Sequence, residues 1–357
     1  MARSPTIYDV ARAANVAPST VSRAFSRPGR VNSQTAQRIR MVAAELGYRA
    51  NPLARGLSTH RTAIIALVIS DITNPFYFEI IRGAQDAAAS AGYTMLLANT
   101  QESDRLERQA LDRAIPVVEG IVLASSRMSD SAIRMTAKQK PIIALNRAVA
   151  DVPSVVTDNP RGVRRALRHL GELMHDSVTY VAGPEASWAD GMRWRSMLEE
   201  SKGIHIKVRR IGPFPPTVEG GVRAAEGLRG HSTTAVIAYN DLLAIGLIRG
   251  LTAMGARVPN DVSVIGFDNI FASDLVTPGL TTVASPLRTQ GTTAVQNLLA
   301  IISGARSSGQ PVVLPTRLVV RGSTAQRRRK RTSPAWGTTS VSGSVSKAAK
   351  STDSGSR

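Results

Sequence analysis

The sequence predicts a small helical head followed by a larger α/β core. Apolar residues recur at helical spacing over residues 6–47, and from residue 63 onward short apolar runs alternate with helical stretches. The net charge of +19 is concentrated at the two ends of the 357-residue chain. Residues 1–61 hold ten arginines and two acids, and residues 323–357 hold eight basic residues and one acid. A chain this long exceeds one typical core, so several domains are expected.

The composition excludes several functional classes. With no cysteine, the chain has no disulfide, thiolate metal site or cysteine nucleophile. The longest unbroken apolar run, residues 63–69, is far short of the roughly 20 residues that span a bilayer. Residues 1–6 show no signal peptide, so a cytoplasmic location without a membrane partner is expected. The basic head favours nucleic acid as a partner, and the alternative is a general preference for arginine over lysine.

The head is predicted to contain three helices. The first spans residues 6–14 with Thr6 as its cap, and the second begins at Pro18, a residue that suits a first helical position. The third follows residues 31–33 and stops at Gly47. This order matches a helix-turn-helix, in which the second helix enters the major groove. Periodicity alone fits an ordinary three-helix bundle equally well.

The second helix has an outward polar face. Pro18, Ser19, Ser22 and Arg23 can face base edges or phosphates. Arg23 is the strongest base-contact candidate because its planar guanidinium can pair bidentately with guanine. The alternative is a solvated arginine.

The core is predicted to be an α/β structure of parallel sheets wound with helices on both faces. Buried strands are expected at residues 63–69, 93–99, 120–125, 141–146, 177–183, 234–240 and 262–268. Helices are expected at residues 77–91, 103–115, 161–174, 218–228 and 242–254.

Polar side chains follow most of these strands, where ligands of parallel sheets bind. Amides, carboxylates and an arginine beside aromatic rings suit a polyol ligand. The alternative is that strand-end residues cap the following helices, as is expected of Asn159 and Asp241. The strand-end candidates are residues 71–76, Asn99, Asn146, Arg147, Asp158, residues 183–187, Asn240, Asp241, Asp268 and Asn269.

Residues 6–57 closely resemble the head of the LacI/GalR family of bacterial transcription regulators. The motifs are Asp-Val-Ala at 9–11, Val-x-x-Ser-Thr-Val-Ser-Arg at 16–23 and Leu-Gly-Tyr-Arg-x-Asn at 46–51. Two departures are Ala17, which replaces the usual serine N-cap at a cost of about 1 kcal/mol, and Ala50, which replaces a common proline. The resemblance implies DNA contacts by Thr6, Pro18, Ser19, Thr20, Ser22, Arg23 and Asn32.

Residues 51–57 correspond to the hinge helix of that family. The resemblance implies that two such helices, one per protomer, enter the minor groove together. Leu57 then matches the leucine that wedges into a base step, and Arg55 is a phosphate or minor-groove contact. Without the resemblance this stretch is a linker, because Pro52 and Gly56 weaken an isolated helix.

The resemblance continues to residue 325, most specifically over residues 238–269. It implies a core like that of periplasmic sugar-binding proteins, with two subdomains joined by crossovers near residues 160, 286 and 320. One departure is the segment 193–197, which lacks the usual Gly-Phe after its arginine. Carried over by position, the effector-binding residues are Phe76, Asp158, Ser187, Trp188, Arg193, Phe214, Asn240 and Asp268.

The expected organisation has four parts. They are a helix-turn-helix head (1–49), a hinge or linker (50–61), an effector-binding and dimerisation core (62–322) and a basic, disordered tail (323–357). Within the core, the N-subdomain comprises residues 62–159 and 287–318, and the C-subdomain residues 160–286 and 319–322. The tail is expected to add at most non-specific phosphate affinity.

The predicted function is that of a DNA-binding transcriptional regulator, a repressor that binds a palindromic operator as a homodimer. A small-molecule effector, a carbohydrate by family resemblance, is expected to control it from the core. The alternatives are a solute-binding protein, which predicts secretion and no basic head, and an α/β enzyme. Nucleotide-binding and zinc-protease motifs are absent, so no catalytic residue, cofactor or metal site is expected.

Overall fold

The computed structural model describes residues 5–26, 29–48, 61–229, 231, 233–307 and 309–327. The expected hinge, with Arg55 and Leu57, and residues 328–357 lie outside the described residues. The chain divides into two units, Met1–Thr157 with Pro286–Leu314 and Asp158–Ser285 with Pro315–Arg357. The third crossover therefore follows Leu314 rather than lying near residue 320.

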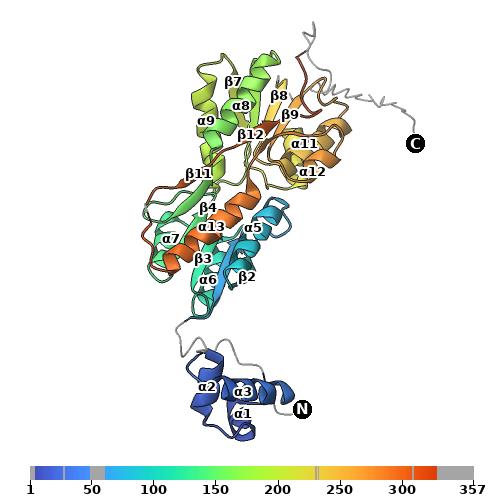
Figure 1. Cartoon of the computed structure of the whole chain (residues 1–357). Coiled ribbons are helices and arrows are strands. Elements are labelled where there is room, and N and C mark those ends of the chain that lie inside the picture. The colour runs from blue at the N-terminus through green and yellow to red at the C-terminus, as the bar shows by residue number, and fades with distance from the viewer. Residues whose placement is uncertain are drawn as a thin grey trace, which may run out of the picture. The chain divides into compact units, whose positions relative to one another are not determined.

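The head consists of α1 (Ile7–Ala13), α2 (Pro18–Ser26) and α3 (Ser33–Glu45), as predicted (Figure 1). Thr6 is the N-cap of α1. Its backbone N–H and its hydroxyl donate to the Asp9 carboxylate at 2.8 Å and 2.7 Å. Asn32 caps α3 by accepting from the Gln34 N–H at 3.0 Å. The three helices enclose a small core of Val10, Ala11, Ala14, Val21, Ala24, Ile39 and Ala43.

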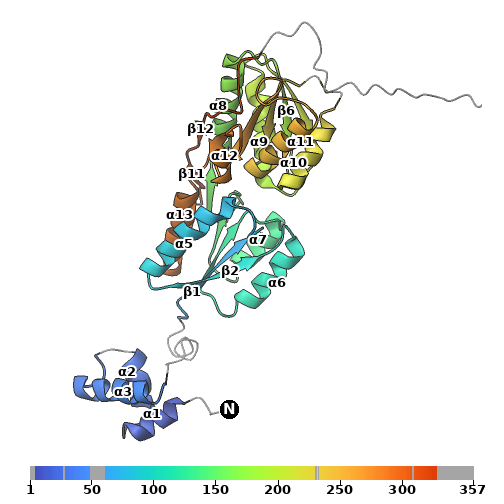
Figure 2. The ribbon, with the colours of Figure 1, turned by 90° about the vertical axis from the view of Figure 1, so that its right-hand side faces the viewer.

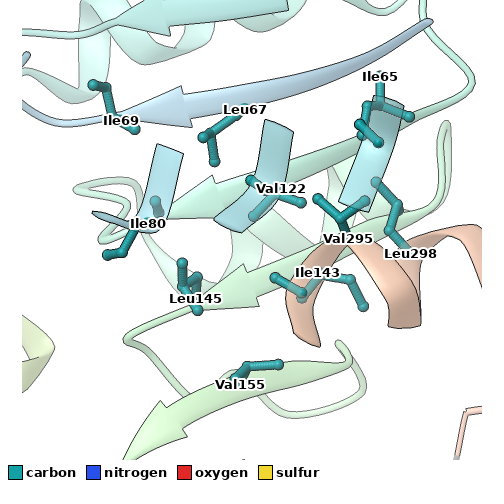
Figure 3. Close-up of a cluster of buried hydrophobic side chains, with 14 of the residues drawn as sticks. Ile65, Leu67, Ile69, Ile80, Val122, Ile143, Leu145, Val155, Val295 and Leu298 are labelled. Atoms are coloured by element: carbon teal, nitrogen blue, oxygen red, sulfur yellow. The ribbon is translucent and has the colours of Figure 1, made fainter. Parts of the chain in front are cut away.

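The remainder of the first unit is a parallel α/β sandwich with strand order β11-β5-β4-β3-β1-β2. Its strands are β1 (Ile64–Ile69), β2 (Thr94–Asn99), β3 (Gly120–Ala124), β4 (Ile142–Leu145), β5 (Ser154–Thr157) and β11 (Val312–Leu314). Its helices are α5 (Phe76–Ser90), α6 (Asp104–Ala114), α7 (Asp130–Ala137) and α13 (Leu287–Ile302). Ile80 of α5 and Val295 and Leu298 of α13 pack on one sheet face against Leu67 and Ile143 (Figure 3). The helices α6 and α7 cover the other face.

The second unit repeats this plan with strand order β12-β10-β9-β8-β6-β7, in which only β12 is antiparallel. Its strands are β6 (Ser177–Val181), β7 (Lys207–Ile211), β8 (Ala235–Ala238), β9 (Ser263–Asp268), β10 (Thr281–Ala284) and β12 (Arg317–Val319). Its helices are α8 (Asn159–Glu172), α9 (Trp188–Ser201), α10 (Val218–Gly227), α11 (Asp241–Ala253) and α12 (Ala272–Leu275). The helix α8 packs beside α9, and α10 beside α11 (Figure 2).

All seven predicted strands and all five predicted core helices are present. The sequence did not predict β5, β7, β10, β11 and β12, nor α7, α9, α12 and α13. Several of these strands have only three or four residues, and β7 (Lys-Val-Arg-Arg-Ile) is too charged to resemble a buried strand. The helix α13 begins after a proline without a side-chain cap, so its start carries no helix signal.

The helix caps lie one residue earlier than expected. Asp158, not Asn159, caps α8 by accepting from the Arg161 N–H at 2.9 Å. Asn240, not Asp241, caps α11 by accepting from the Leu243 N–H at 2.9 Å. The prediction was wrong because an N-cap has non-helical backbone angles and belongs to the loop before the helix, as both Asp158 and Asn240 do. Asn159 and Asp241 are therefore available for other contacts.

The start of the expected tail is packed, which corrects the prediction of disorder from residue 323. Ser323 is fully buried, and its hydroxyl donates to the Val264 carbonyl at 2.6 Å and accepts from the Thr281 N–H at 2.8 Å. The Arg327 N–H donates to the Leu173 carbonyl at 2.8 Å. Residues 323–327 are thus part of the second unit, held by hydrogen bonds that a search for apolar side chains does not detect.

His175 anchors this segment and makes its packing sensitive to pH. Its Nε2 lies 3.1 Å from the Ala325 carbonyl oxygen, so this nitrogen carries the proton, and its Nδ1 lies 3.0 Å from the Thr234 hydroxyl. Burial lowers the pKa of His175 below its usual value. At this position the unfolded chain therefore binds a proton more readily than the folded chain, and the contribution of His175 to stability falls as the pH drops below about 6.5.

We expect the change from pH 7.5 to 5.5 to shift the stability of the second unit less favourably in the wild-type protein than in a His175→Asn variant, because only the wild-type protein gains a proton at this position when it unfolds. Urea denaturation at a series of pH values, followed by tryptophan fluorescence, measures both. An identical pH dependence in the two proteins would contradict this role of His175.

Candidate functional sites

The exposed face of α2 carries polar and cationic groups. Val21 and Ala24 face the head core, whereas Pro18, Ser19 and Arg23 are exposed. The two remaining candidates on this helix, Thr20 and Ser22, are half-buried. The helix begins without a side-chain cap, since position 17 is alanine. Its first residue, Pro18, has no N–H to satisfy, and the Thr20 N–H donates to the Ala17 carbonyl at 2.8 Å.

A buried arginine occupies the carboxyl ends of the strands in the second unit. The side chain of Arg193, on α9, donates from Nε to the Asn159 Oδ1 at 3.0 Å and from one terminal nitrogen to the Tyr239 carbonyl. Its other terminal nitrogen lies 3.5 Å from the Asp268 carboxylate. The guanidinium carbon is 4.1 Å from the Phe267 ring centroid and 5.2 Å from that of Tyr239, within cation–π range. Residues of α8 and at the ends of β8 and β9 therefore surround the Arg193 guanidinium, which α9 supplies.

Two buried carboxyl groups lie beside this cation. Asp268 ends β9 with a φ of 109°, a conformation that side chains rarely adopt. Burial raises the pKa of Asp268 well above its usual range, although Arg193 acts in the opposite direction and Asp241 adds to the rise. Burial also raises the pKa of Asp241 to about 6. Asp241 accepts from the hydroxyls of Ser273 at 2.7 Å and Thr282 at 2.6 Å, and so anchors the segment after β9.

A further buried carboxylate, that of Asp190, shapes the loop after β6. Asp190, on α9, accepts at 2.8 Å from both the Tyr180 hydroxyl and the Gly183 N–H. Its other oxygen accepts from Arg210 of β7 at 2.7 Å. These contacts fix the loop that begins at Gly183, immediately before α9 and Arg193.

The structure brings several of the predicted effector residues together. Arg193 and Asp268 form an ion pair, and the Ser187 hydroxyl lies 2.9 Å from the Tyr239 hydroxyl. Asn240 follows Tyr239 and is held by its capping bond and by donation to the Pro216 carbonyl at 3.2 Å. These residues all lie at the carboxyl ends of β8 and β9 or at the start of α9.

The other predicted effector residues are less closely connected. Phe214 follows β7, and its N–H donates to the Ala182 carbonyl at 3.0 Å. Trp188 begins α9 and is half-buried, and the carboxylate of Asp158 is engaged in capping α8. Phe76 belongs to the first unit, where it begins α5 and its ring meets the Tyr77 ring edge-on at 5.0 Å.

Sequence reasoning missed four residues that hold this site, namely Asn159, Tyr239, Asp190 and Arg210. A polar residue at the end of a strand was the available signal for Tyr239, but Asp190 and Arg210 lie within a helix and a strand. Within the described ranges, no group of three histidine, aspartate or glutamate side chains could hold a metal ion. None of the helices in those ranges is long and apolar enough to cross a membrane.

Both parts of the chain match known protein families. Residues 6–51 match the family described as bacterial regulatory proteins, lacI family, and residues 167–324 match the periplasmic binding protein-like domain. The HTH-type transcriptional regulator DegA of Bacillus subtilis is 34% identical over 331 residues, which cover 90% of this chain and 98% of DegA. The HTH-type transcriptional repressor CytR of Escherichia coli K12 is 31% identical over 89% of this chain and 96% of CytR.

Solved structures are similar over comparable lengths. A lac repressor dimer bound to operator and the anti-inducer ONPF has a TM-score of 0.80 at 25% identity, covering 90% of this chain and all of that one. A LacI family regulator of Enterococcus faecium with bound ribose has a TM-score of 0.67 at 30% identity, covering 74% of this chain and all of that one.

We expect Arg193→Met to destabilise the second unit by about 3–5 kcal/mol, because it leaves buried carboxylates without their cation. Urea denaturation followed by tryptophan fluorescence measures this loss. The matched variant Arg193→Met/Asp268→Leu removes both charges and should recover much of it. A single variant as stable as the double would show that the ion pair does not hold the site.

Proposed function

Because the chain belongs to the lacI family of bacterial regulatory proteins, we propose that it represses transcription from a palindromic operator under the control of a small carbohydrate. It is a DNA-binding transcriptional regulator, as its relatives DegA and CytR are, and not an enzyme. A solute-binding protein would share the α/β core but not the head at residues 6–51. Its DNA target places the protein in the cytoplasm.

The exposed face of α2 supports the DNA-binding part of the proposal. Arg23 reads a guanine edge in the major groove, beside Pro18 and Ser19. The polar groups of Thr6, Thr20, Ser22 and Asn32 contact the backbone and fix the register of the helix. Arg55 and Leu57, outside the described residues, complete the site in the minor groove.

Exposed apolar side chains support a homodimer. In the first unit, Leu96 and Leu97 are about two-fifths exposed on β2, an edge strand of its sheet. In the second unit, Phe271 is 62% and Leu275 75% exposed. Pairing two copies about a two-fold axis covers such patches and presents two heads to the half-sites of a palindrome.

The arginine–carboxylate centre of the second unit supports an effector site, and this single observation carries the carbohydrate proposal. Arg193, Asp268 and Asn240 offer fixed donors and acceptors to hydroxyl groups, with Asp158 and Ser187 as further polar contacts. Within the same unit, the rings of Trp188 and Phe214 stack on the apolar face of a sugar, whereas Phe76 of the first unit stays a prediction from family resemblance. The similar E. faecium regulator was solved with ribose. The ligand controls repression only if it binds the two DNA-binding states with different affinity.

We expect Arg23→Ala to weaken operator binding by about 1–3 kcal/mol and to relax specificity at one base pair of each half-site. Fluorescence anisotropy with operator duplexes substituted at single positions measures both effects. The control is Arg40→Ala, an exposed arginine on α3. Unchanged affinity in the Arg23 variant would refute the major-groove assignment.

We expect at least one member of a panel of pentoses and hexoses, with ribose as the first probe, to raise the melting temperature of the full chain. The shift should be lost in Asp268→Asn and kept in Asp112→Asn, an exposed aspartate on α6. An undiminished melting-temperature shift in Asp268→Asn would show that the effector does not bind at the Arg193–Asp268 centre. A rise in melting temperature with nucleobases alone would show that the effector is a nucleobase and not a carbohydrate.

A further inference from the structure

An arginine-rich groove on the second unit is not used by operator or effector binding as proposed above. Arg161, Arg164, Arg165 and Arg168 recur at positions i, i+3, i+4 and i+7 of α8, so they share one helix face, and all four are exposed. They line an open groove of about 690 Å³ between α8 and β12. The other lining residues are Asp158, His169, Glu172, Leu318 and Val320.

Within the described part of the chain, three of these four arginines form no ion pair, although Asp158 and Glu172 also line the groove. Arg164 pairs with Glu200 of α9 at 2.8 Å. Among the described residues, no carboxylate lies within 4.0 Å of the guanidinium groups of Arg161, Arg165 or Arg168. Three guanidinium groups along one groove are therefore free to bind an external anion.

The basic tail leaves the domain at the end of the same helix. The Arg327 N–H donates to the Leu173 carbonyl, directly after α8, and the Arg327 side chain pairs with Asp176. In the sequence, Arg327 is followed by Arg328, Arg329, Lys330 and Arg331. These four residues lie outside the described residues, and the structure places only Arg327 beside the end of α8.

We propose that the α8 face binds the phosphate backbone of a second DNA duplex without reading its sequence. Arg161 and Arg168 are about 10 Å apart along the helix axis at 1.5 Å per residue. A DNA strand carries a phosphate about every 3.4 Å of duplex axis, so a stretch of duplex of this length presents several phosphates to the three unpaired arginines. Phosphate contacts position a protein on DNA but carry no sequence information.

An acidic protein segment is the competing partner. The aliphatic side chains of Leu318 and Val320 could anchor one apolar residue of such a segment. The groove offers only these two aliphatic side chains, whereas Arg161, Arg165 and Arg168 repeat a cation along two turns of α8, as the repeating phosphates of a DNA backbone require. The arrangement of charge along the helix therefore favours DNA.

The test uses the full-length protein saturated with unlabelled operator, so that the heads are occupied. A labelled 20-base-pair non-operator duplex is then added, and its binding is followed by anisotropy at several salt concentrations. We expect a ternary complex that weakens with salt. In Arg161→Gln/Arg165→Gln/Arg168→Gln the second-duplex affinity should fall at least tenfold and the salt slope by about 2 to 3, at about 0.9 per lost phosphate contact.

The control is Arg105→Gln/Arg113→Gln/Arg223→Gln, which removes three exposed arginines from α6 and α10 with the same change in net charge. This control should retain the wild-type affinity for the second duplex. The wild-type protein and both triple variants should bind operator with equal affinity. The design relies on operator binding as proposed above, and that binding is measured separately. Failure to form the operator complex would therefore contradict the proposed function and not the proposal for the α8 groove.

Three results would overturn the proposal. The first is failure of the wild-type protein to bind a second duplex, or an equal loss of second-duplex affinity in both triple variants. The second is loss of the second duplex on removal of residues 328–357 with no loss in the α8 variant, which would assign binding to the tail alone. The third is arginine-dependent binding of a 20-residue polyglutamate but not of the duplex, which would assign the groove to an acidic protein.

Discussion

The buried guanidinium of Arg193 connects more of the second unit than any single apolar contact described above. It reaches from α9 to the first residue of α8, to the carbonyl after β8 and to the carboxylate that ends β9. A buried cation is costly unless it is paired and fully hydrogen-bonded, so each of these partners must keep its place. The ligand-facing end of the sheet is therefore held in shape before any ligand arrives.

The other strand-end contacts follow from this constraint. Asp268 can approach the cation only with its backbone in a left-handed conformation, and Asp241 stabilises the segment that follows it. Asp190 fixes the loop from which α9 starts, and so fixes the position of Arg193 itself. A site built this way orients a polar ligand with little rearrangement, which agrees with effector control of a regulator.

Much of the fold could be predicted from the sequence, because apolar periodicity and helix signals are local. The head helices and the long buried strands have such patterns. The helix α13 and the strands β7 and β12 do not, since their formation depends on the sheet that they join. In the candidate site, Asn240 and Asp268 could be predicted as polar residues at strand ends, whereas Arg193 was predicted only through family resemblance. Asn159 and Arg210 acquire their roles from contacts across 34 and 20 residues with Arg193 and Asp190, and no local pattern encodes such contacts.

The proposed function requires that a ligand at the Arg193 centre and DNA at the head are coupled. Operator titrations without and with a saturating concentration of the sugar that raises the melting temperature measure this coupling. We expect a change in operator affinity of several-fold or more, and an equal reciprocal change in sugar affinity when operator is bound. Identical operator affinities with and without the bound sugar would contradict it.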